Sequence, residues 1–445
     1  MAQFLKTPKE WPAVLTGRAA ALKSDPADLD AAIRAGAFDG LRKAVRDLGP
    51  TGTIATIAQS GLRGRGGGGF PTGEKWRAAT NEPATQRYVV ANGYGADPSV
   101  RTDATLIGAD PWGVVEGLAI AAFATGATEA IIAIRAADAA LVTLLEGAIL
   151  AAEEAGFLGE DVLGSGYRIT MTVRPVQGAY MLGEETVLLK ALEGKRGQPE
   201  QRPPYPAQRG LFGRPTVVNN VQTLAAVPWI IREGAPVYAA IGAKGSPGTI
   251  LVQLRGPEGG GIAEVPLGTK LRELVKLAGG SGSRSLKAVL VGGPTGGLLP
   301  SDLIDTAYDF DALREAGAHI GSGSVVIADD RACVVDLARL LTKFSADEAC
   351  GKTIPCRIGL QRLYEIGDRV STGRPKPTDM ALMADLAHDV AASGLCEHER
   401  LATLPFTSGM RYFRSELDDH LLRSSCPAGV CHPIAVGAAA TPGSR

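Results

Sequence analysis

The sequence is poor in cysteine, histidine and aromatic residues, and it lacks a long uncharged apolar run. Its 445 residues include six cysteines and five histidines, and aromatic residues make up 5%. So few cysteines exclude a disulfide-rich scaffold. A membrane span needs about 20 consecutive, mostly uncharged residues. Charges such as Glu116, Arg135 and Glu146 interrupt the most apolar stretch, 112–157, which therefore predicts a buried helix, strand and helix.

Neither the net charge nor the N-terminal composition points to nucleic acid or export. The 46 Lys and Arg residues balance 47 Asp and Glu residues, for a formal net charge of −1. This balance argues against a broad nucleic-acid-binding surface. The first residues, MAQFLKTPKEWPAVLTGR, lack the apolar core of a signal peptide. We therefore expect a soluble, cytoplasmic protein.

The few cysteines are confined to the last quarter of the chain. They are Cys333, Cys350, Cys356, Cys396, Cys426 and Cys431. Random scatter would rarely place all of them there. Without an export signal, clustered thiols indicate metal ligands more than disulfides.

Composition and periodicity divide the chain into five segments. We expect an N-terminal helical segment over 1–58, an α/β domain over 59–245, a small α+β unit over 246–329, a helical bundle over 330–435 and a flexible tail over 436–445. Strand-like segments at 87–93, 129–135 and 167–176 alternate with helical ones, which indicates a mainly parallel sheet. After residue 330, apolar residues recur at helical spacing, as is typical of a bundle.

Residues 60–76, SGLRGRGGGGFPTGEKW, are rich in glycine. Glycines let backbone N–H groups approach a phosphate closely because no Cβ intervenes. The segment GRGGGG at 64–69 fits the pattern G-x-G-x-x-G, which by itself is a weak indication. No clear strand precedes Gly64, unlike in an ordinary dinucleotide fold, and a flexible surface loop is the alternative. The flanking cationic and aromatic residues are Arg63, Arg65, Lys75, Phe70 and Trp76.

Two further polar pairs have side chains suited to a nucleotide. Glu184 and Glu185 stand at the start of an expected helix. They can accept hydrogen bonds from ribose hydroxyls, or they can be surface charges that favour the helix dipole. Asn219 and Asn220 lie in an apolar setting, where their amides suit the edge of a heterocycle.

Taken together, the chain resembles the flavin-binding NADH dehydrogenase subunit of respiratory complex I. It equally resembles relatives in NAD-reducing hydrogenases and NAD-dependent formate dehydrogenases. The motifs that carry the resemblance are SGLRGRGGGGFPTGEKW, GAYMLGEET, EGKRGQPEQRPPYPA, PTVVNNVQTL and ACGKTIPCRIG. They imply an α/β protein with a Rossmann-like FMN domain, a ubiquitin-like (SLBB) α+β insert and a C-terminal helical bundle that holds a [4Fe–4S] cluster.

The resemblance also implies an activity and partners. NADH would transfer a hydride to FMN, and single electrons would pass to iron–sulfur centres of partner subunits. These partners would be a small thioredoxin-like [2Fe–2S] subunit and a larger iron–sulfur or catalytic subunit.

Roles follow from the matching motifs. The residues implied in FMN binding are Gly64, Arg65, Gly66, Gly67, Lys75, Asn92, Gly183, Glu184, Asn219, Asn220 and Thr223. Those implied in contacting NADH are Gly68, Phe70, Lys75, Glu185 and Tyr205, the last by stacking on adenine. Lys75 and Glu184 are expected next to the reacting ring.

The chain departs from the family near the flavin. After Asn92 the family usually has an acidic residue, but this chain has Tyr94 and Gly95, with Asp97 as a displaced substitute. Leu182 replaces a cysteine in GAYMLGEET. The first change puts the affinity or potential of FMN in question.

A larger departure affects the cluster motif. Cys350, Cys356 and Cys396 match three of the family's four cysteines, whereas Thr353 replaces the fourth. Thr353, a water molecule or His398 could complete a cubane. A [3Fe–4S] centre and a lost cluster are the alternatives, and we expect an iron–sulfur cluster.

The C-terminal residues predict a second metal site. His420, Cys426 and Cys431 have the spacing H-x5-C-x4-C, which suits zinc. Cys333 is the candidate fourth ligand. Hydrogenase-type family members have a similar tail with a zinc site. The alternatives are free thiols or a labile disulfide between Cys426 and Cys431.

Two competing interpretations remain at this stage. One is a non-catalytic scaffold that has lost its cluster. The other is NADPH as the donor, with Arg202 or Arg209 near its 2′-phosphate, although Glu185 disfavours a phosphate there.

Overall fold

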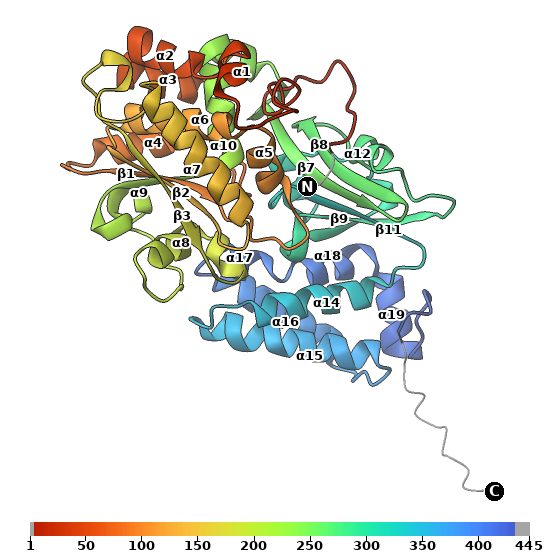
Figure 1. Ribbon diagram of the computed structural model, residues 1–445. Helices are drawn as coiled ribbons and strands as arrows, with labels where there is room; N and C mark the ends of the chain where they lie inside the picture. The colour runs from red at the N-terminus through yellow and green to blue at the C-terminus, as the bar shows by residue number, and fades with distance from the viewer. Residues whose placement is uncertain (1–3, 432–445) are drawn as a thin grey trace, which may run out of the picture.

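The computed structural model describes residues 4–431, which form a parallel α/β layer, a mixed sheet and a helical bundle (Figure 1). The α/β layer has four strands in the order β3-β2-β1-β4, all parallel. They are β1 (Tyr88–Gly93), β2 (Glu129–Arg135), β3 (Thr170–Val176) and β4 (Thr216–Asn220). The predicted parallel sheet is therefore confirmed, and β4 is a strand that the periodicity did not reveal.

Helices enclose this sheet. They are α1 (Leu29–Arg34), α2 (Asp39–Lys43), α3 (Gly49–Ser60), α4 (Thr72–Asn81), α5 (Thr102–Ala109), α6 (Pro111–Thr125), α7 (Ala139–Glu154), α8 (Glu185–Leu192), α9 (Pro206–Arg209), α10 (Val221–Glu233) and α11 (Ala235–Ala239). The helix, strand and helix expected within 112–157 are α6, β2 and α7.

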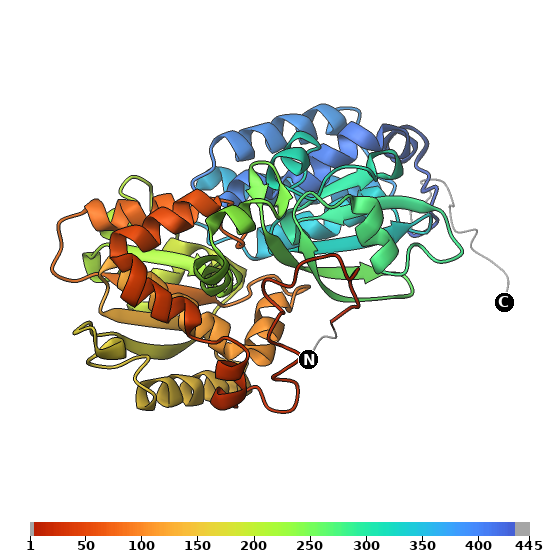
Figure 2. The same ribbon diagram turned by 90° about the horizontal axis from the view of Figure 1, so that it is seen from above.

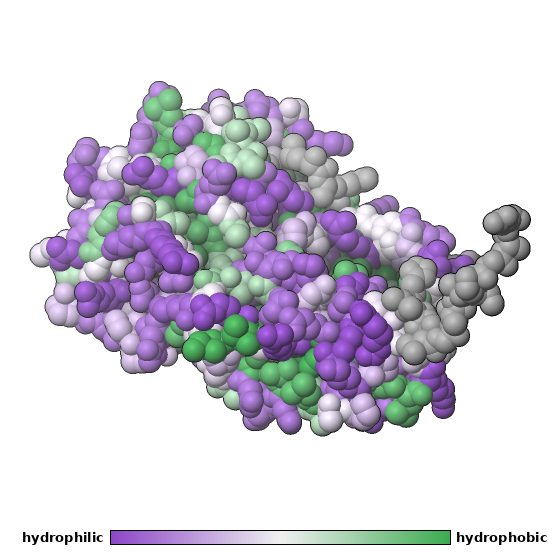
Figure 3. All heavy atoms as spheres, turned by 90° about the horizontal axis from the view of Figure 1, so that it is seen from below, coloured by the Kyte–Doolittle hydropathy of each residue, from purple (hydrophilic) through white to green (hydrophobic). Residues whose placement is uncertain are grey.

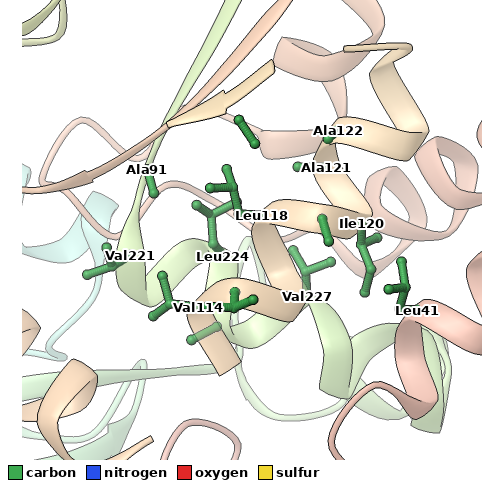
Figure 4. Close-up of a cluster of buried hydrophobic side chains, with 14 of the residues drawn as sticks. Leu41, Ala91, Val114, Leu118, Ile120, Ala121, Ala122, Val221, Leu224 and Val227 are labelled. Atoms are coloured by element: carbon green, nitrogen blue, oxygen red, sulfur yellow. The ribbon is translucent and has the colours of Figure 1, made fainter. Parts of the chain in front are cut away.

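The centre of the α/β core is the crossing of α6 and α10 (Figure 4). Every residue of α6 is buried, and its sequence is apolar except for Glu116 and Thr125, as expected for a helix enclosed by protein. The axes come close because Gly117 has no side chain. A Cβ at Gly117 would overlap the carbonyl oxygen of Leu224 in α10.

The second sheet is mixed and has the strand order β10-β9-β11-β7-β8. Its elements are β7 (Thr249–Gly256), β8 (Gly259–Pro266), α12 (Leu271–Leu277), β9 (Leu286–Val291), β10 (Gly297–Pro300), α13 (Phe310–Glu315) and β11 (Ser324–Asp329). Strand β11 pairs parallel with β7 and antiparallel with β9. The strands at β7, β8 and β9 and helix α12 were predicted, while β10 and β11 were not. The ubiquitin-like identity of this unit stays a prediction.

The N-terminal coil is tied to the second sheet (Figure 2). Leu5 N–H donates to the carbonyl of Ile262 at 2.7 Å. The buried carboxylate of Glu264 in β8 accepts from the N–H groups of Val14 and Leu15 at 2.8 Å each and of Thr16 at 2.9 Å. A buried carboxylate satisfied by backbone donors thus fixes the start of the chain on β8.

The remaining helices form the C-terminal bundle below both sheets in Figure 1. They are α14 (Val334–Asp347), α15 (Leu360–Ser371), α16 (Asp379–Ala392), α17 (Glu397–Leu401), α18 (Leu404–Tyr412) and α19 (Arg414–Arg423). Helix α15 is strongly amphipathic, with Leu363, Ile366 and Val370 buried at helical spacing. The expected tail over 436–445 lies outside the described residues.

Among residues 4–431, no single helix is both long and apolar enough to cross a membrane, although α5 and α6 reach that length and composition jointly across a 97° bend.

The α6–α10 crossing yields a stability prediction. Gly117→Ala should lower the free energy of unfolding by about 2 to 3 kcal/mol, because the added methyl group has no space against Leu224. The matched control is Gly147→Ala in α7, where a Cβ meets no atom within 4 Å. It should leave stability unchanged or raise it by about 0.5 to 1 kcal/mol. Urea unfolding followed by circular dichroism measures both, and equal stability of the two variants would contradict the close crossing.

Candidate functional site

The candidate site lies at the carboxyl edge of the parallel sheet, between β1 and β4. Strand order reverses there, because β1 pairs with β2 on one side and with β4 on the other. Such a switch point is the usual ligand crevice of an open α/β sheet. The strand ends bring Asn92 opposite Asn220 and Ala91 opposite Asn219. The asparagines that the sequence analysis singled out therefore share one edge.

The glycine-rich loop folds over this edge from the turn between α3 and α4. Its neck is closed by the N–H of Gly64, which donates to the carbonyl of Phe70 at 2.9 Å. A Cβ at Gly66 would lie 3.3 Å from the Cβ of Asn220, so the loop rests on the end of β4. Gly67 has φ +105°, a conformation that favours glycine, and a Cβ at Gly68 would meet nothing within 4 Å. The loop thus presents bare backbone to open space, a cradle of the kind that a phosphate requires.

Arg65 anchors the loop from inside. The side chain is 1% exposed, and its guanidinium donates to Thr249 O at 2.9 Å, to Pro247 O at 2.6 Å and to Tyr238 Oη at 2.9 Å. Its backbone N–H donates to Thr223 Oγ1 at 2.8 Å. Burial lowers the pKa of Arg65. Arg65 and Thr223 hold the loop against α10 and the segment that leads into the second sheet. The contact of Arg65 and Thr223 with FMN stays a prediction.

Lys75 and two glutamates form a charged network beside the loop. Lys75 Nζ donates to Glu185 Oε2 at 2.9 Å and to the carbonyl of Val218 in β4 at 3.0 Å. Arg202 pairs with Glu184 and lies 3.3 Å from Glu185 Oε1. Burial alone would raise the pKa of Glu185, but the charges of Lys75 and Arg202 outweigh it and lower that pKa. Glu185 is therefore held ionised at this edge.

Glu184 also caps the N-terminus of α8. Its carboxylate accepts from the N–H groups of Thr186 at 2.9 Å and Val187 at 3.0 Å, as a helix N-cap does. The alternative interpretation of Glu184 as a helix-dipole charge is thus partly correct. Its other oxygen faces Arg202.

The three asparagines are fixed by separate partners. Asn92 Nδ2 donates to Gly183 O at 3.0 Å, Asn219 Oδ1 accepts from Trp76 Nε1 at 2.9 Å, and Asn220 Nδ2 donates to Asp103 at 2.7 Å. These bonds join the ends of β1 and β4 to the segment before α8, to α4 and to α5. These contacts link eight of the predicted site residues to this edge of the sheet. They are Gly66, Lys75, Asn92, Gly183, Glu184, Glu185, Asn219 and Asn220.

The residues that depart from the family pattern are turned inward. Tyr94 is buried, and its hydroxyl donates to Gly178 O while Arg135 lies over its ring at 5.0 Å. Asp97 is also buried and accepts from Ser99 N–H at 2.8 Å and Ser322 Oγ at 2.9 Å. Both side chains brace the chain after β1, and the carboxylate of Asp97 is engaged with the second sheet.

The two aromatics expected to contact NADH are exposed. Phe70 is 56% exposed and Tyr205 is 53% exposed. Flat exposed rings near a glycine loop are suited to stacking on a nucleotide.

Three thiols lie near the junction of the bundle and the α/β layer. Cys356 and Cys396 are buried, and Cys350 is half-buried. Cys350 and Cys396 belong to an apolar cluster shared with the α/β layer, and Cys356 belongs to a separate cluster of the bundle. Burial raises the pKa of Cys356 to about 12, so this thiol is protonated unless a bound metal ion stabilises the thiolate.

Thr353 and His398, the two side chains proposed as the fourth cluster ligand, each form a hydrogen bond within the protein. Thr353 Oγ1 donates to Glu399 Oε1 at 2.8 Å. His398 Nε2 donates to Ser345 O at 3.0 Å, and its ring packs edge-on against Tyr180.

A second group of four ligands meets at the far end of the bundle. The ligand atoms of Cys333, His420, Cys426 and Cys431 all lie within 4.8 Å of one another. His420 Nε2 is 3.4 Å from Cys333 Sγ, and Cys431 Sγ is 3.6 Å from the same Cys333 Sγ. All four cysteine and histidine positions expected from the sequence thus come together, and the thiols are free.

An outer partner orients the histidine of this group. His420 Nδ1 donates to the carbonyl of Glu416 at 2.8 Å, which leaves Nε2 directed at the thiols. Such an outer hydrogen bond is the usual way in which a metal-binding histidine is oriented.

Sequence reasoning missed several residues that complete these sites. Asp103, Arg135 and Glu399 belong to no motif, and only the fold brings them to the strand ends or the thiols. Asp103 is half-buried in the folded chain, and nothing in its local sequence singled it out.

Comparisons with known proteins agree with this geometry. Residues 57–229 match the Nuo51 FMN-binding domain, and residues 336–420 match the NADH-ubiquinone oxidoreductase-F iron–sulfur binding region. The NADP-reducing hydrogenase subunit HndC of Solidesulfovibrio fructosivorans is 40% identical over 410 residues, covering 92% of this chain and 83% of the relative. The F subunit of the NADH-quinone oxidoreductase of Streptomyces coelicolor is 38% identical, covering 90% of this chain and 89% of the relative.

A solved structure has the same fold. It is that of the NAD⁺-reducing [NiFe]-hydrogenase in the H₂-reduced state, which aligns with a TM-score of 0.81 at 30% sequence identity, over 95% of this chain and 68% of that chain.

The loop anchor gives a prediction. Arg65→Met removes all guanidinium donors and leaves buried oxygens of Tyr238, Pro247 and Thr249 without a partner. We expect a loss of about 3 kcal/mol in unfolding free energy. The control, Arg77→Met, removes a surface arginine paired only with Glu74, and should change stability by less than about 0.5 kcal/mol. Chemical denaturation checks both values, and a stable Arg65→Met protein would show that the loop does not need this anchor.

Proposed function

The chain belongs to the family of FMN-binding NADH dehydrogenase subunits, and on this premise we propose that it binds FMN and NADH at the carboxyl edge of its parallel sheet. It acts as an NAD(H) oxidoreductase subunit with an iron–sulfur region. The single observation that supports this placement is the meeting of the glycine loop, Lys75, Glu185 and the asparagine ends of β1 and β4 at one switch point.

The chain's own groups have distinct tasks in this proposal. The backbone of the glycine loop at Gly66, Gly67 and Gly68, which is open to space at Gly68, would receive the phosphate and one face of the flavin. The amides of Asn92 and Asn219 lie at the strand ends, within reach of ring edges and ribityl hydroxyls. When bound, FMN supplies the hydride acceptor and the conversion from two-electron to one-electron chemistry.

The charged network orients the nucleotide. Lys75 keeps a fixed position because Glu185 and the carbonyl of Val218 hold its ammonium group. Ionised Glu185 can accept hydrogen bonds from the ribose hydroxyls of NADH. Phe70 and Tyr205 supply exposed rings for stacking. Binding and orientation, rather than proton transfer, are the tasks of these side chains.

We propose NADH rather than NADPH as the partner of this site. Arg202, the candidate for a 2′-phosphate contact, is paired with Glu184 and Glu185. A 2′-phosphate would therefore face two carboxylates as well as the arginine. The name of the Solidesulfovibrio relative nevertheless contains NADP, so the test below uses both nucleotides.

The bundle carries the metal sites of the proposal. Cys350, Cys356 and Cys396 hold an iron–sulfur cluster, and Cys333, His420, Cys426 and Cys431 hold zinc. Four soft ligands in a closed arrangement are typical of structural zinc. A scaffold that has lost its cluster is less favoured, because three of the four cluster cysteines and all four ligands of the second group are present.

Electrons leave to other chains, because relatives are subunits of larger enzymes. We propose a thioredoxin-like [2Fe–2S] subunit and a larger iron–sulfur or catalytic subunit as partners. Apolar side chains gather on the lower face of the molecule (Figure 3), and the exposed large apolar residues of the bundle include Leu340, Ile354, Ile358 and Leu382. Exposed apolar surface of this kind is typical of interfaces. A cytoplasmic location remains a prediction.

The activity has a direct test. The purified chain, reconstituted with FMN, should reduce ferricyanide with NADH and much more slowly with NADPH. Lys75→Met should slow NADH-dependent reduction at least tenfold, equivalent to about 1.4 kcal/mol, because the positioned charge beside the flavin is lost. The control is Lys270→Met, at a lysine whose side chain is 58% exposed. A preparation that binds FMN but shows no activity with either nucleotide would refute the proposal.

Zinc content tests the second metal site. The purified chain should hold about one zinc ion, and His420→Gln should lose most of it because one of four ligands is gone. His388→Gln, at an exposed histidine of α16, should retain it. Elemental analysis measures the metal, and a zinc-free wild-type chain would overturn the assignment.

A further inference from the structure

Glu399 is a buried carboxylate without a cationic partner, and it lies beside the three thiols. Its side chain belongs to α17, which begins immediately after Cys396, and the residue is 1% exposed. Among the described residues, no lysine, arginine or histidine forms an ion pair with it. A glutamate is rarely buried this completely unless it is paired or coordinates a metal.

The hydrogen bonds of Glu399 place it between two segments of the cluster motif. Cys396 is the residue before α17, and Glu399 lies in the first turn of this helix. The carboxylate of Glu399 accepts from Thr353 Oγ1 at 2.8 Å, and Thr353 stands three residues from both Cys350 and Cys356 in the chain. Glu399 therefore joins the segment of Cys396 to the segment of the other two thiols.

The carboxylate is held in place but retains free lone pairs. Oε1 accepts from Thr353 Oγ1 at 2.8 Å, and Oε2 accepts from the N–H of Leu395 at 2.7 Å. A carboxylate has about four lone-pair positions, so two hydrogen bonds leave room for a metal ion.

Thr353 connects this carboxylate to the missing cysteine. It occupies the position at which the sequence motif has its fourth cysteine, and its hydroxyl points at Glu399. A hydroxyl is a neutral, weak ligand, whereas a carboxylate carries the same single negative charge as the thiolate that is absent. Substituting Glu399 for the thiolate keeps the total ligand charge unchanged.

His398 is less suited to the role. Its Nε2–H is directed to Ser345 O, and its ring lies against Tyr180. Its Nδ1 has no hydrogen-bond partner, so a His398 variant belongs in the test.

We propose that Glu399 supplies an oxygen ligand to the fourth iron of the cluster held by Cys350, Cys356 and Cys396, with Thr353 positioning the carboxylate. This inference rests on the proposed function, because that function includes an iron–sulfur cluster in the bundle. Ligation replaces a water molecule on iron with a carboxylate oxygen; no covalent bond of the protein breaks and no electron is transferred. Iron accepts carboxylate ligands readily in other proteins.

The test compares Glu399→Gln with a matched control in the same helix. The full-length chain is reconstituted anaerobically with FMN, ferrous iron and sulfide, and iron is counted per chain beside EPR spectra of the oxidised and reduced protein. Wild type should hold four irons per cluster. Glu399→Gln should lose about one in four and show the EPR signal of an oxidised [3Fe–4S] centre. Glu397→Gln changes an exposed carboxylate paired with Arg400 and should behave as wild type.

A rescue variant separates ligation from folding. In the double variant Glu399→Gln with Thr353→Cys, the new thiolate restores the fourth ligand, and the fourth iron should return. Failure of this rescue, or a Glu399→Gln protein with four irons and an unchanged spectrum, would overturn the proposal. Loss of the fourth iron in His398→Gln but not in Glu399→Gln would assign the ligand to His398 instead. A wild-type chain that takes up no iron would also overturn it.

These outcomes are independent of the flavin site. NADH-dependent ferricyanide reduction fails if the FMN proposal is wrong, whereas the iron count and EPR spectrum report on Glu399 alone.

Discussion

The geometry of the glycine-rich loop at the candidate site depends on one buried guanidinium. Arg65 lies in the middle of a loop that has almost no side chains of its own, so the loop cannot hold its shape by apolar packing. The arginine instead uses carbonyls of the second sheet and the hydroxyl of Tyr238 as acceptors. Its backbone N–H bonds to Thr223 in α10. A loop that must offer bare backbone to a ligand is thereby made rigid from behind.

This anchor explains why the second sheet matters to a site at the edge of the first. The strand ends of β1 and β4 supply amides, and α4 supplies Lys75, but the loop above them is fixed by Thr249 and Pro247 in the region of β7. The chain after β1 is braced in the same way, through Asp97 and Ser322. The binding edge is therefore built from both sheets, and neither sheet alone would define it.

The two ends of the bundle carry different groups of potential metal ligands. At one end, His420 directs Nε2 toward three thiols, and the carbonyl of Glu416 fixes its orientation. At the other end lie two buried thiols, the half-buried thiol of Cys350 and the buried Glu399, which forms no ion pair among the described residues. Both groups of side chains are suited to a metal or a cluster, because a bound metal ion compensates the charge of its ionised ligands. Thr353, which replaces a cysteine of the motif, is hydrogen-bonded to the carboxylate of Glu399.

Local pattern was sufficient for much of the molecule. The alternation of β1, β2 and β3 with helices, the apolar run of α6 and the clustering of cysteines in the last quarter could all be recognised from the sequence, because periodicity and residue type act over short distances. Strands β4 and β10 were not predicted, since they are short and contain asparagine, or glycine and proline. Strand β11 was not predicted although it is mainly apolar, and its pairing with β7 and β9 is non-local. Asparagines at the end of β4 looked like a polar cluster because their strand pairing is non-local.

The order of amino acids was enough to establish which groups were available: the glycine loop, the paired glutamates, three cysteines of one motif and four ligands of another. Their use depends on the folded arrangement. Folding turned Arg65 and Thr223 inward as supports, directed Thr353 to Glu399, and brought Cys333 to His420 across 87 residues of chain. The physical reason is that burial, charge compensation and hydrogen-bond partners are set by neighbours in space, and no spacing along the chain encodes them.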